Sequence, residues 1–378
     1  MRVRGLLVSL FAIGMAAAGP AATPDLPKLL EEVRVKHRLP ALACAVVRSN
    51  VVVAQAVVGV RKAGDPTPAT LADVWHHGSL TKSMTATLAA LLVEDGKIAW
   101  TDTLADVFPA AAPKMDPAWR SVTLEQLLGH RGGAPDPAWL EEKGLWAGFW
   151  KAPGPPRGQR RWLREAVTAL PPQHGPDTVH VYSNTGYILA GAMLEERAGK
   201  PWEDLVTERV FGPLGMRSAG FGAPGSPGAL DQPWGHTLSW PLRNLQPVAP
   251  GPLADNPPGL GPAGTVHCSL PDLTTYLMAH VSGELGRPTP LGLPTAAWRK
   301  LHTALALQAY ALGWGVVRRS WSGGDALNHT GSNTLWFSNA WLAPRRDFAV
   351  VVLTNVGGDA AAKATDEVAA QVIAGWLR

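Results

Sequence analysis

Three short motifs, in a fixed order along the 378-residue chain, constrain it more than any other feature. They are Ser79-Leu80-Thr81-Lys82, Tyr182-Ser183-Asn184 and His329-Thr330-Gly331-Ser332. Each motif alone arises by chance in long chains. Together they supply a hydroxyl beside an amine, a phenol beside an amide, and a strand-like segment. We therefore expect a fold that brings three distant segments to one place.

The first two motifs predict the catalytic residues Ser79, Lys82 and Tyr182. A serine hydroxyl is a poor nucleophile at neutral pH unless a base lies beside it. Ser79 stands where a long helix is expected to begin, so the helix dipole favours negative charge on its oxygen. Lys82 follows at the spacing that places two side chains on one helix face. It either holds the proton acceptor in place as an ammonium or, if desolvated, acts as the base itself. Tyr182 is the second candidate proton carrier, with its phenolate stabilised by Lys82.

The predicted substrate-binding residues come from the second and third motifs. If the second motif is extended, Asn184 offers its amide to Lys82 or to substrate on the same side as the phenol. The third motif is expected to be a strand that runs along a cleft. The backbone N–H of Ser332, with that of Ser79, is expected to form an oxyanion hole. The predicted substrate-binding set is Asn184, His329, Thr330, Gly331 and Ser332.

Hydrophobic periodicity predicts strands at both ends of the chain and helices between them. The fold class expected is α/β (α+β), an antiparallel sheet flanked by helices and built from both termini, with an inserted helical domain at roughly 97–262 and a cleft between the two. Aspartates in two Asp-Pro-Ala-Trp segments, Asp116 and Asp136, are expected to cap helices. The predicted helices are Asp25–Lys36, Ser79–Asp95, Leu270–Val281 and Ala361–Leu377, and the predicted strands are a hairpin in Leu42–Val60 and the runs Leu312–Ser320, Asn328–Ser332, Leu335–Leu342 and Phe348–Asn355.

The N-terminus has the features of a secretory signal peptide, which we place at residues 1–23. Arg2 and Arg4 precede an apolar run, and Ala16-Ala17-Ala18 offers a small-residue cleavage site. The run is too short for a stable membrane span. A retained membrane-associated helix is the alternative. We expect a mature chain of residues 24–378 that is periplasmic or secreted.

The composition indicates a folded globular protein and argues against several kinds of partner. Hydrophobic residues make up 46% of the chain and charged residues 17%. The formal charge of +4 falls to +2 without Arg2 and Arg4, and no basic stripe is present. Nucleic acid and anionic membrane are therefore not expected as partners. The expected partner is a small-molecule or peptide substrate, and the oligomeric state stays open.

The sequence predicts no metal or organic cofactor. Cys44 and Cys268 are the only cysteines, which excludes a disulfide scaffold and a cysteine-based zinc site. Whether these two pair or stay as buried thiols is left open. His76 and His77 lack a carboxylate or third histidine at ligand spacing, so we interpret them as a structural pair.

Beyond the three motifs, the chain resembles the class C β-lactamase-related serine hydrolases over roughly Pro24–Arg378. That group includes class C β-lactamases, D-Ala-D-Ala carboxypeptidases, D-amino-acid peptidases and family VIII carboxylesterases. The resemblance implies a β-lactamase/transpeptidase-like fold, with Ser79 as nucleophile and Lys82 and Tyr182 as its proton-transfer partners. The segments that carry it are Gly78–Ser83, Leu104–Pro109, Leu127–His130, Val181–Tyr187, Pro213–Met216 and Val351–Asn355.

Two departures from the family pattern bear on the substrate. The third motif begins with His329 where the family's β-lactamases have lysine, which weakens the grip on a substrate carboxylate. The segment Ser332–Trp336 lacks the usual glycines and is expected to reshape one wall of the cleft. His130 also lies in a variant motif, and we interpret it as structural.

The expected function is an exported serine hydrolase acting through a Ser79 acyl-enzyme on an ester or D-amino-acid-type amide. The alternatives are a β-lactamase, a D-Ala-D-Ala carboxypeptidase, or a catalytically inactive binding protein of the same fold.

Overall fold

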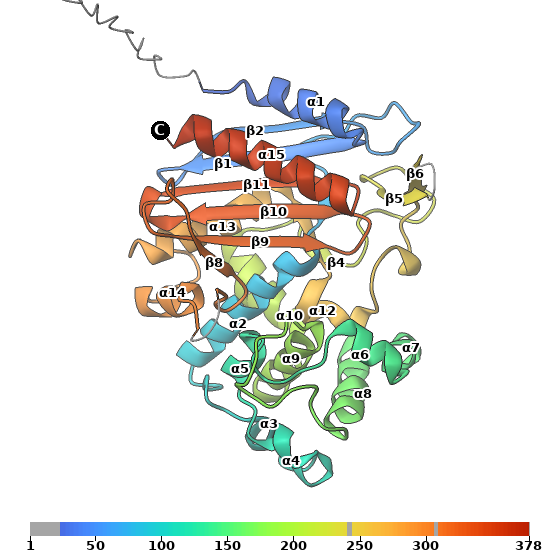
Figure 1. The fold of residues 1–378 in the computed structure, drawn as a ribbon, viewed down its shortest axis with the longest axis vertical. Helices are drawn as coiled ribbons and strands as arrows, with labels where there is room; N and C mark the ends of the chain where they lie inside the picture. Colours follow the sequence, from blue (N-terminus) through green and yellow to red (C-terminus); the bar gives the residue numbers. More distant parts are fainter. Residues whose placement is uncertain (1–22, 240–243, 306–308, 378) are drawn as a thin grey trace, which may run out of the picture.

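A computed structural model describes residues 23–239, 244–305 and 309–377. The predicted signal peptide falls almost wholly on residues 1–22, outside the described part. Figure 1 shows two terminal helices over one face of a sheet, and a group of helices below the sheet in that view. The described residues include no helix with both the length and the apolar character needed to cross a bilayer.

The main sheet has six antiparallel strands in the order β2-β1-β11-β10-β9-β8. Its central pairing joins the two ends of the chain, with Leu42 opposite Thr354 and Arg48 opposite Phe348. The predicted antiparallel sheet built from both termini is therefore confirmed. The strands are β1 (Ala41–Arg48), β2 (Val51–Gly59), β8 (Gly315–Arg318), β9 (Asp325–Ser332), β10 (Phe337–Ala343) and β11 (Phe348–Thr354).

The two faces of this sheet are covered by different helices because side chains alternate along a strand. Leu42, Cys44 and Val46 pack in one hydrophobic cluster with α1 (Leu26–His37) and α15 (Asp359–Trp376). The alternate residues of β1 pack in a second cluster, which includes α2 (Thr81–Glu94) and α13 (Leu270–Glu284). These four helices lie where the sequence predicts them. The hairpin turn between β1 and β2 consists of Ser49 and Asn50, both at positive φ, as a two-residue turn requires.

The region between the terminal parts is mainly helical. Asp116 and Asp136 cap α4 and α6 as predicted, each accepting a backbone N–H. The helices are α3 (Leu104–Val107), α4 (Pro117–Arg120), α5 (Leu124–Leu128), α6 (Pro137–Glu142), α7 (Leu145–Lys151), α8 (Pro156–Thr168), α9 (Asn184–Ala198), α10 (Trp202–Val206), α11 (Gly212–Leu214), α12 (Gly261–Gly264) and, further on, α14 (Thr295–His302).

This region also contains strands that the sequence reading did not include. β5 (Gly235–Ser239) and β6 (Asn244–Val248) form a separate pair. A small sheet joins β3 (Val74–His76), β7 (Val266–Ser269) and β4 (Gly220–Phe221). β3 leads directly to the turn that carries Ser79, so this small sheet helps to place that residue.

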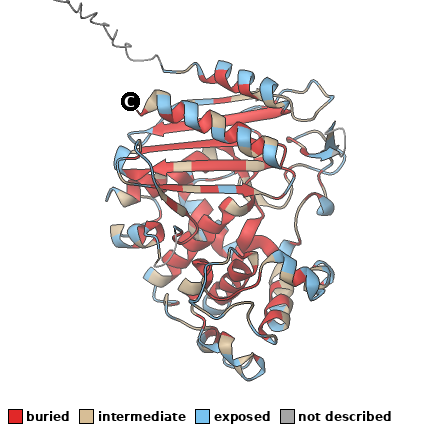
Figure 2. Ribbon diagram, viewed as in Figure 1, coloured by how far each residue is buried: buried red, intermediate tan, exposed pale blue. Residues whose placement is uncertain are grey.

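The core passes from the sheet into the central helices, as the buried residues in Figure 2 show. α2 is buried around its whole circumference from Thr81 to Leu92, so a lysine on it has no route to solvent along the helix. Cys44 and Cys268 are both free and buried, in separate sheets. Burial raises the pKa of both thiols, which makes them inert packing residues.

Candidate active site

Ser79 lies in a single 3₁₀ turn, Gly78–Leu80, that leads into α2. The turn packs directly against the end of β9: a Cβ added to Gly78 would lie 2.3 Å from the amide nitrogen of Ser332. Gly78 also has a φ of +50°, so only glycine suits this position on both counts. The close approach places the first and third motifs side by side.

Lys82 is completely buried and contacts Ser79. Its Nζ lies 3.0 Å from Oγ of Ser79. Nζ also donates to Oδ1 of Asn184 and to the carbonyl oxygen of Ala263, each at 2.7 Å. Burial lowers the pKa of Lys82 well below its ordinary value. As an ammonium, Nζ donates to all three oxygens; in the neutral form, its two N–H groups can serve the two carbonyl-type acceptors, which leaves the lone pair for the Ser79 hydroxyl.

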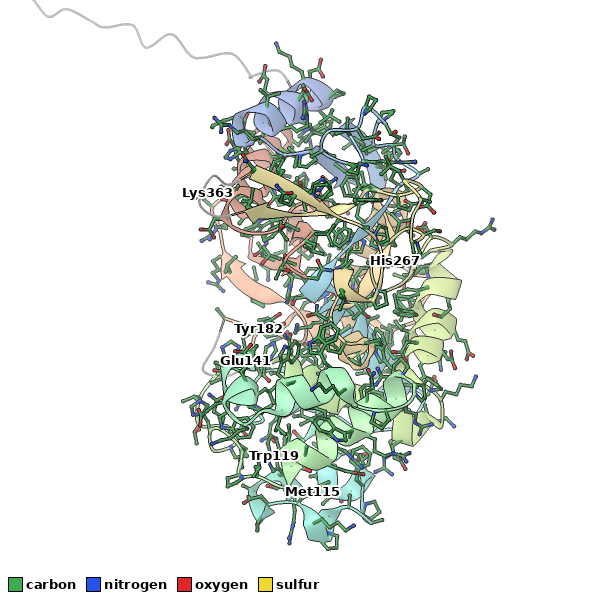
Figure 3. All side chains as sticks on the ribbon, turned by 90° about the vertical axis from the view of Figure 1, so that its right-hand side faces the viewer. Met115, Trp119, Glu141, Tyr182, His267 and Lys363 are labelled. Atoms are coloured by element: carbon green, nitrogen blue, oxygen red, sulfur yellow. The ribbon has the colours of Figure 1, made fainter. Side chains whose placement is uncertain are left out.

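The second motif reaches Lys82 by a different route from the one expected. It does not continue as an extended segment: Ser183 is the N-cap of α9, and Asn184 is the first helical residue. The turn still brings both side chains to Lys82, because the Tyr182 ring centroid lies 4.8 Å from Nζ. Figure 3 shows Tyr182 where the sheet part of the molecule meets the helical part.

Tyr182 is a phenol rather than the phenolate expected from the sequence. Desolvation raises the pKa of Tyr182 above its ordinary value, and a hydrogen bond with the Ser79 side chain opposes that rise only in part. The residue keeps 41% of its surface exposed. The phenol therefore lies at the rim of the site, with a proton to give.

His130 holds the second motif in place, consistent with its structural interpretation. Its Nδ1 accepts a hydrogen bond from the Ser183 backbone N–H at 3.1 Å. Its ring lies 4.5 Å from that of Tyr182. Burial, with Lys82 nearby, lowers the pKa of His130 well below its usual value, so the ring is neutral. The sequence did not show that the His130 ring packs against the ring of Tyr182.

The third motif forms the end of β9 and leaves one of its edges open. β9 pairs with β10 as far as Ser332, whereas β8 pairs only with Asp325–Asn328. The second edge of His329–Ser332 is therefore outside the described sheet pairing, where an extended substrate can add as a further strand. The Thr330 side chain is exposed on this segment.

Gly331 brings two backbone amides together beside Ser79. A Cβ on Gly331 would lie 2.0 Å from the His77 carbonyl oxygen and 2.8 Å from the Ser79 amide nitrogen. Together with the approach of Gly78 to the Ser332 amide, this arrangement sets the Ser79 and Ser332 amides at one location. Two such N–H groups are what a developing oxyanion needs.

His329 is a neutral residue in this site. Its Nδ1 lies 2.6 Å from the Thr330 carbonyl oxygen, which can only accept, so Nδ1 carries the proton. Its Nε2 then accepts from the Tyr310 hydroxyl at 3.2 Å. Burial and the nearby Lys82 lower the pKa of His329 to about 3. Tyr310 was not identified from the sequence, because no local motif marks it.

Asp255 and Asn333 are two further residues that the sequence analysis missed. Asp255 Oδ2 lies 2.9 Å from Nε2 of His76, and Oδ1 accepts from Asn333 Nδ2 at 3.0 Å. His77 lies near Cys268, with 3.0 Å between Nε2 and Sγ. Within the described ranges, no three histidine, cysteine or acidic side chains are grouped so as to hold a metal ion.

With this geometry established, comparison with known proteins identifies the family. The chain matches the Beta-lactamase family over residues 26–374 and belongs to it. This result confirms the resemblance inferred from the motifs.

Two curated relatives and one solved structure illustrate the range of the likeness. The chain is 27% identical to penicillin-binding protein 4 of Amycolatopsis lactamdurans, over 89% of this chain and 86% of the relative. It is 28% identical to an unguisins hydrolase of Aspergillus campestris, over 76% of this chain but only 53% of that longer protein. The octameric penicillin-binding protein homologue from Pyrococcus abyssi shares the fold, with a TM-score of 0.73 at 22% identity over 93% of this chain and 78% of that one.

Proposed function

We propose that this chain is a serine hydrolase in which Ser79 forms an acyl-enzyme with an ester or a D-amino-acid-type amide. The observation that carries the proposal is the 3.0 Å contact between Ser79 Oγ and a fully buried Lys82 Nζ. Burial lowers the pKa of Lys82, which favours the neutral amine that can accept a proton, and its contact with Ser79 is the one that activation of the hydroxyl requires.

The remaining groups suit the steps that follow. As Lys82 takes the proton, Ser79 attacks the substrate carbonyl, whose oxygen moves into the pair of amides from Ser79 and Ser332. The Tyr182 phenol donates a proton to the leaving group and takes one back from protonated Lys82, which restores both groups for the second half of the reaction. Water then repeats the sequence on the acyl-enzyme and releases the acid. The two amides stabilise the charge that develops in each tetrahedral intermediate.

The His329 side chain is neutral, so it favours substrates that have no carboxylate in the part that would lie beside it. A lysine ammonium there could pair with a substrate carboxylate, whereas His329 offers no positive charge at neutral pH because burial lowers its pKa to about 3. This supports an ester or amide substrate over a β-lactam or a peptide with a free C-terminal carboxylate. The likeness to penicillin-binding protein 4 supports the second candidate, a D-Ala-D-Ala carboxypeptidase.

We also propose that the mature protein acts outside the cytoplasm, because of the charged start and apolar run before Gly19.

Intact-mass spectrometry of the mature protein tests the proposal. The protein is incubated with a fluorescent penicillin, a p-nitrophenyl ester, or the p-nitroanilides of D- and L-alanine. We expect turnover of the ester or of the D-anilide, an acyl adduct on Ser79, and loss of both in Ser79→Ala. A stable penicilloyl adduct would favour the carboxypeptidase instead. A folded wild-type protein that reacts with none of these probes would contradict the enzyme assignment and leave the inactive binding protein.

A further inference from the structure

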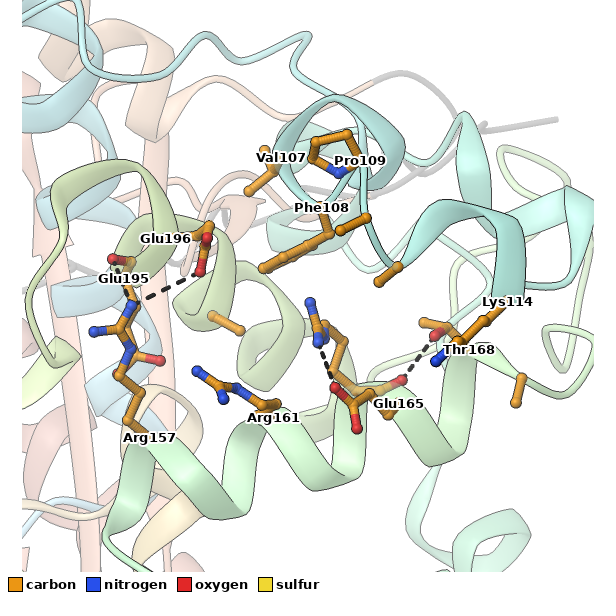
Figure 4. A pocket seen from close by; sticks show the side chains of 15 residues that line it. Val107, Phe108, Pro109, Lys114, Arg157, Arg161, Glu165, Thr168, Glu195 and Glu196 are labelled. Carbon is orange, nitrogen blue, oxygen red and sulfur yellow. Dashed lines mark hydrogen bonds and ion pairs between the residues drawn. The ribbon is translucent and has the colours of Figure 1, made fainter.

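A cavity of about 570 Å³ lies in the helical region, away from Ser79. α8 and α9 form two of its sides, and the loop after α3 forms a third (Figure 4). None of the three motifs contributes a lining residue. α9 nevertheless runs from the active site, where it begins at Asn184, to this cavity near Glu196.

Cationic side chains converge on the cavity from two directions. Arg157, Arg161 and Arg164 are spaced four and three residues apart on α8, which places them on one face of the helix. Lys114 also lines the cavity and comes from the segment after α3. Figure 4 shows the side chains of Arg157 and Arg161 rising from α8 toward this space.

The acidic residues of the cavity pair with only some of these cations. Glu196 pairs with Arg157 at 3.7 Å, and Glu165 pairs with Arg164 at 2.9 Å. The third carboxylate, Glu195, is held by the buried Arg160, which does not line the cavity. Among the residues that the structure describes, Arg161 has neither an ion pair nor a side-chain hydrogen bond. Positive charge is therefore in excess at this cavity.

Arg164 gives a second, independent reason to expect that an anion binds in this cavity. It is only 7% exposed, and its guanidinium lies over the Phe108 ring at 4.1 Å. Its Nε is buried without a hydrogen-bond partner. A buried donor left without an acceptor is costly, and a ligand oxygen at the guanidinium edge would relieve that cost. Burial also lowers the pKa of Arg164, and the contact with Glu165 opposes that effect.

We propose that this cavity is a binding site for a small amphipathic anion, with a carboxylate or phosphate head on Arg161 and Arg164. Arginine suits such heads because its planar fork binds two oxygens at once. Val107, Phe108 and Ala192 line the same cavity and receive the apolar part of the ligand. The site is separate from the proposed catalytic centre.

Calorimetric titration with octyl phosphate and with octanoate tests the proposal, the two probes distinguishing the two kinds of head group. We expect at least one probe to bind the wild-type protein, and octan-1-ol and inorganic phosphate to bind about tenfold or more weakly. Arg161→Gln should weaken binding by about tenfold. Arg164→Gln should weaken binding further. Because Arg164 is buried, this variant could fold poorly; the Arg161→Gln variant, at an exposed side chain, then still tests the proposal.

The matched control is Arg299→Gln, which removes an equally exposed helical arginine that does not line the cavity. It should bind as the wild type does. Ser79→Ala should also bind normally, so the outcome does not depend on the proposed hydrolase activity. The proposal would be overturned if neither probe bound the wild-type protein, if octan-1-ol bound as tightly as the probes, or if Arg161→Gln bound the probe with unchanged affinity.

Discussion

The carboxylate of Asp255 lies 2.9 Å from Nε2 of His76, while Nδ1 of the same ring accepts the backbone N–H of Gly78 at 3.0 Å. The bond from Gly78 leaves Nδ1 without a proton, so Nε2 donates to Asp255. The other carboxylate oxygen holds Asn333, directly after the third motif. Asp255 thus connects the turn that carries Ser79 to the end of β9, the two segments that carry the amides of the proposed oxyanion hole.

Asp255→Asn is expected to lower kcat by about tenfold with little change in KM, because small shifts of the two amides weaken stabilisation of the transition state more than of bound substrate. Steady-state kinetics on the best ester provide the measurement. Asp325→Asn, at an exposed pair with Arg318, is the control and should leave kcat unchanged. Equal kcat in the Asp255 variant and the wild type would remove this residue from any positioning role.

Lys82→Arg is expected to lower the acylation rate by about 10³-fold or more, because arginine stays protonated and cannot accept the serine proton. In the wild type, burial lowers the pKa of Lys82 well below its ordinary value. The rate should therefore stay level between about pH 8 and 10, where an ordinary lysine titrates, and fall toward acid as the amine takes up a proton. A stopped-flow pH profile that climbs steadily to pH 10 would mean that Lys82 is an ordinary ammonium.

Tyr182→Phe should fold normally but acylate about 10²-fold more slowly, because the leaving group loses its proton donor. Tyr187→Phe is a matched control: its hydroxyl donates to the Leu128 carbonyl in the core. That variant should lose stability while keeping most of its acylation rate. Burst kinetics and thermal unfolding of both variants separate the two effects, and near-normal acylation without the Tyr182 hydroxyl would exclude it from the mechanism.

Acid should destabilise the protein through its buried neutral histidines. Burial lowers the pKa of both His77 and His329 to about 3, against about 6.5 for an unfolded histidine. Between these values the unfolded chain binds protons that the folded chain does not, so the free energy of unfolding falls as pH falls from about 6.5 to 3. Each group adds a slope of up to about 1.4 kcal/mol per pH unit.

Urea unfolding at a series of pH values measures that slope. His329→Gln removes one of the two groups, so its stability should fall less steeply in acid than that of the wild type. The comparison is made between slopes and not between stabilities at one pH, because the substitution also alters packing. Identical slopes for the two proteins would show that His329 does not resist protonation.

Much of the fold could be predicted because the signals are local. Leu26, Leu29, Leu30 and Val33 recur at helical spacing, and all four are buried in α1. The break at Arg48-Ser49-Asn50 marks the hairpin turn. The strands β4, β5 and β6 were missed because they are short and lie among Pro/Gly-rich segments, where periodicity carries little information.

The sequence by itself determined which reactive groups are present and which family the chain belongs to, because the hydroxyl, the amine and the phenol are read directly from the motifs. Only the tertiary structure decided their protonation states. Desolvation lowers the pKa of Lys82 and raises that of Tyr182, which favours the neutral amine and the neutral phenol. His329 is neutral because it is buried between Lys82 and Tyr310. Desolvation and contacts between distant segments exist only in the folded chain, so no motif could have predicted them.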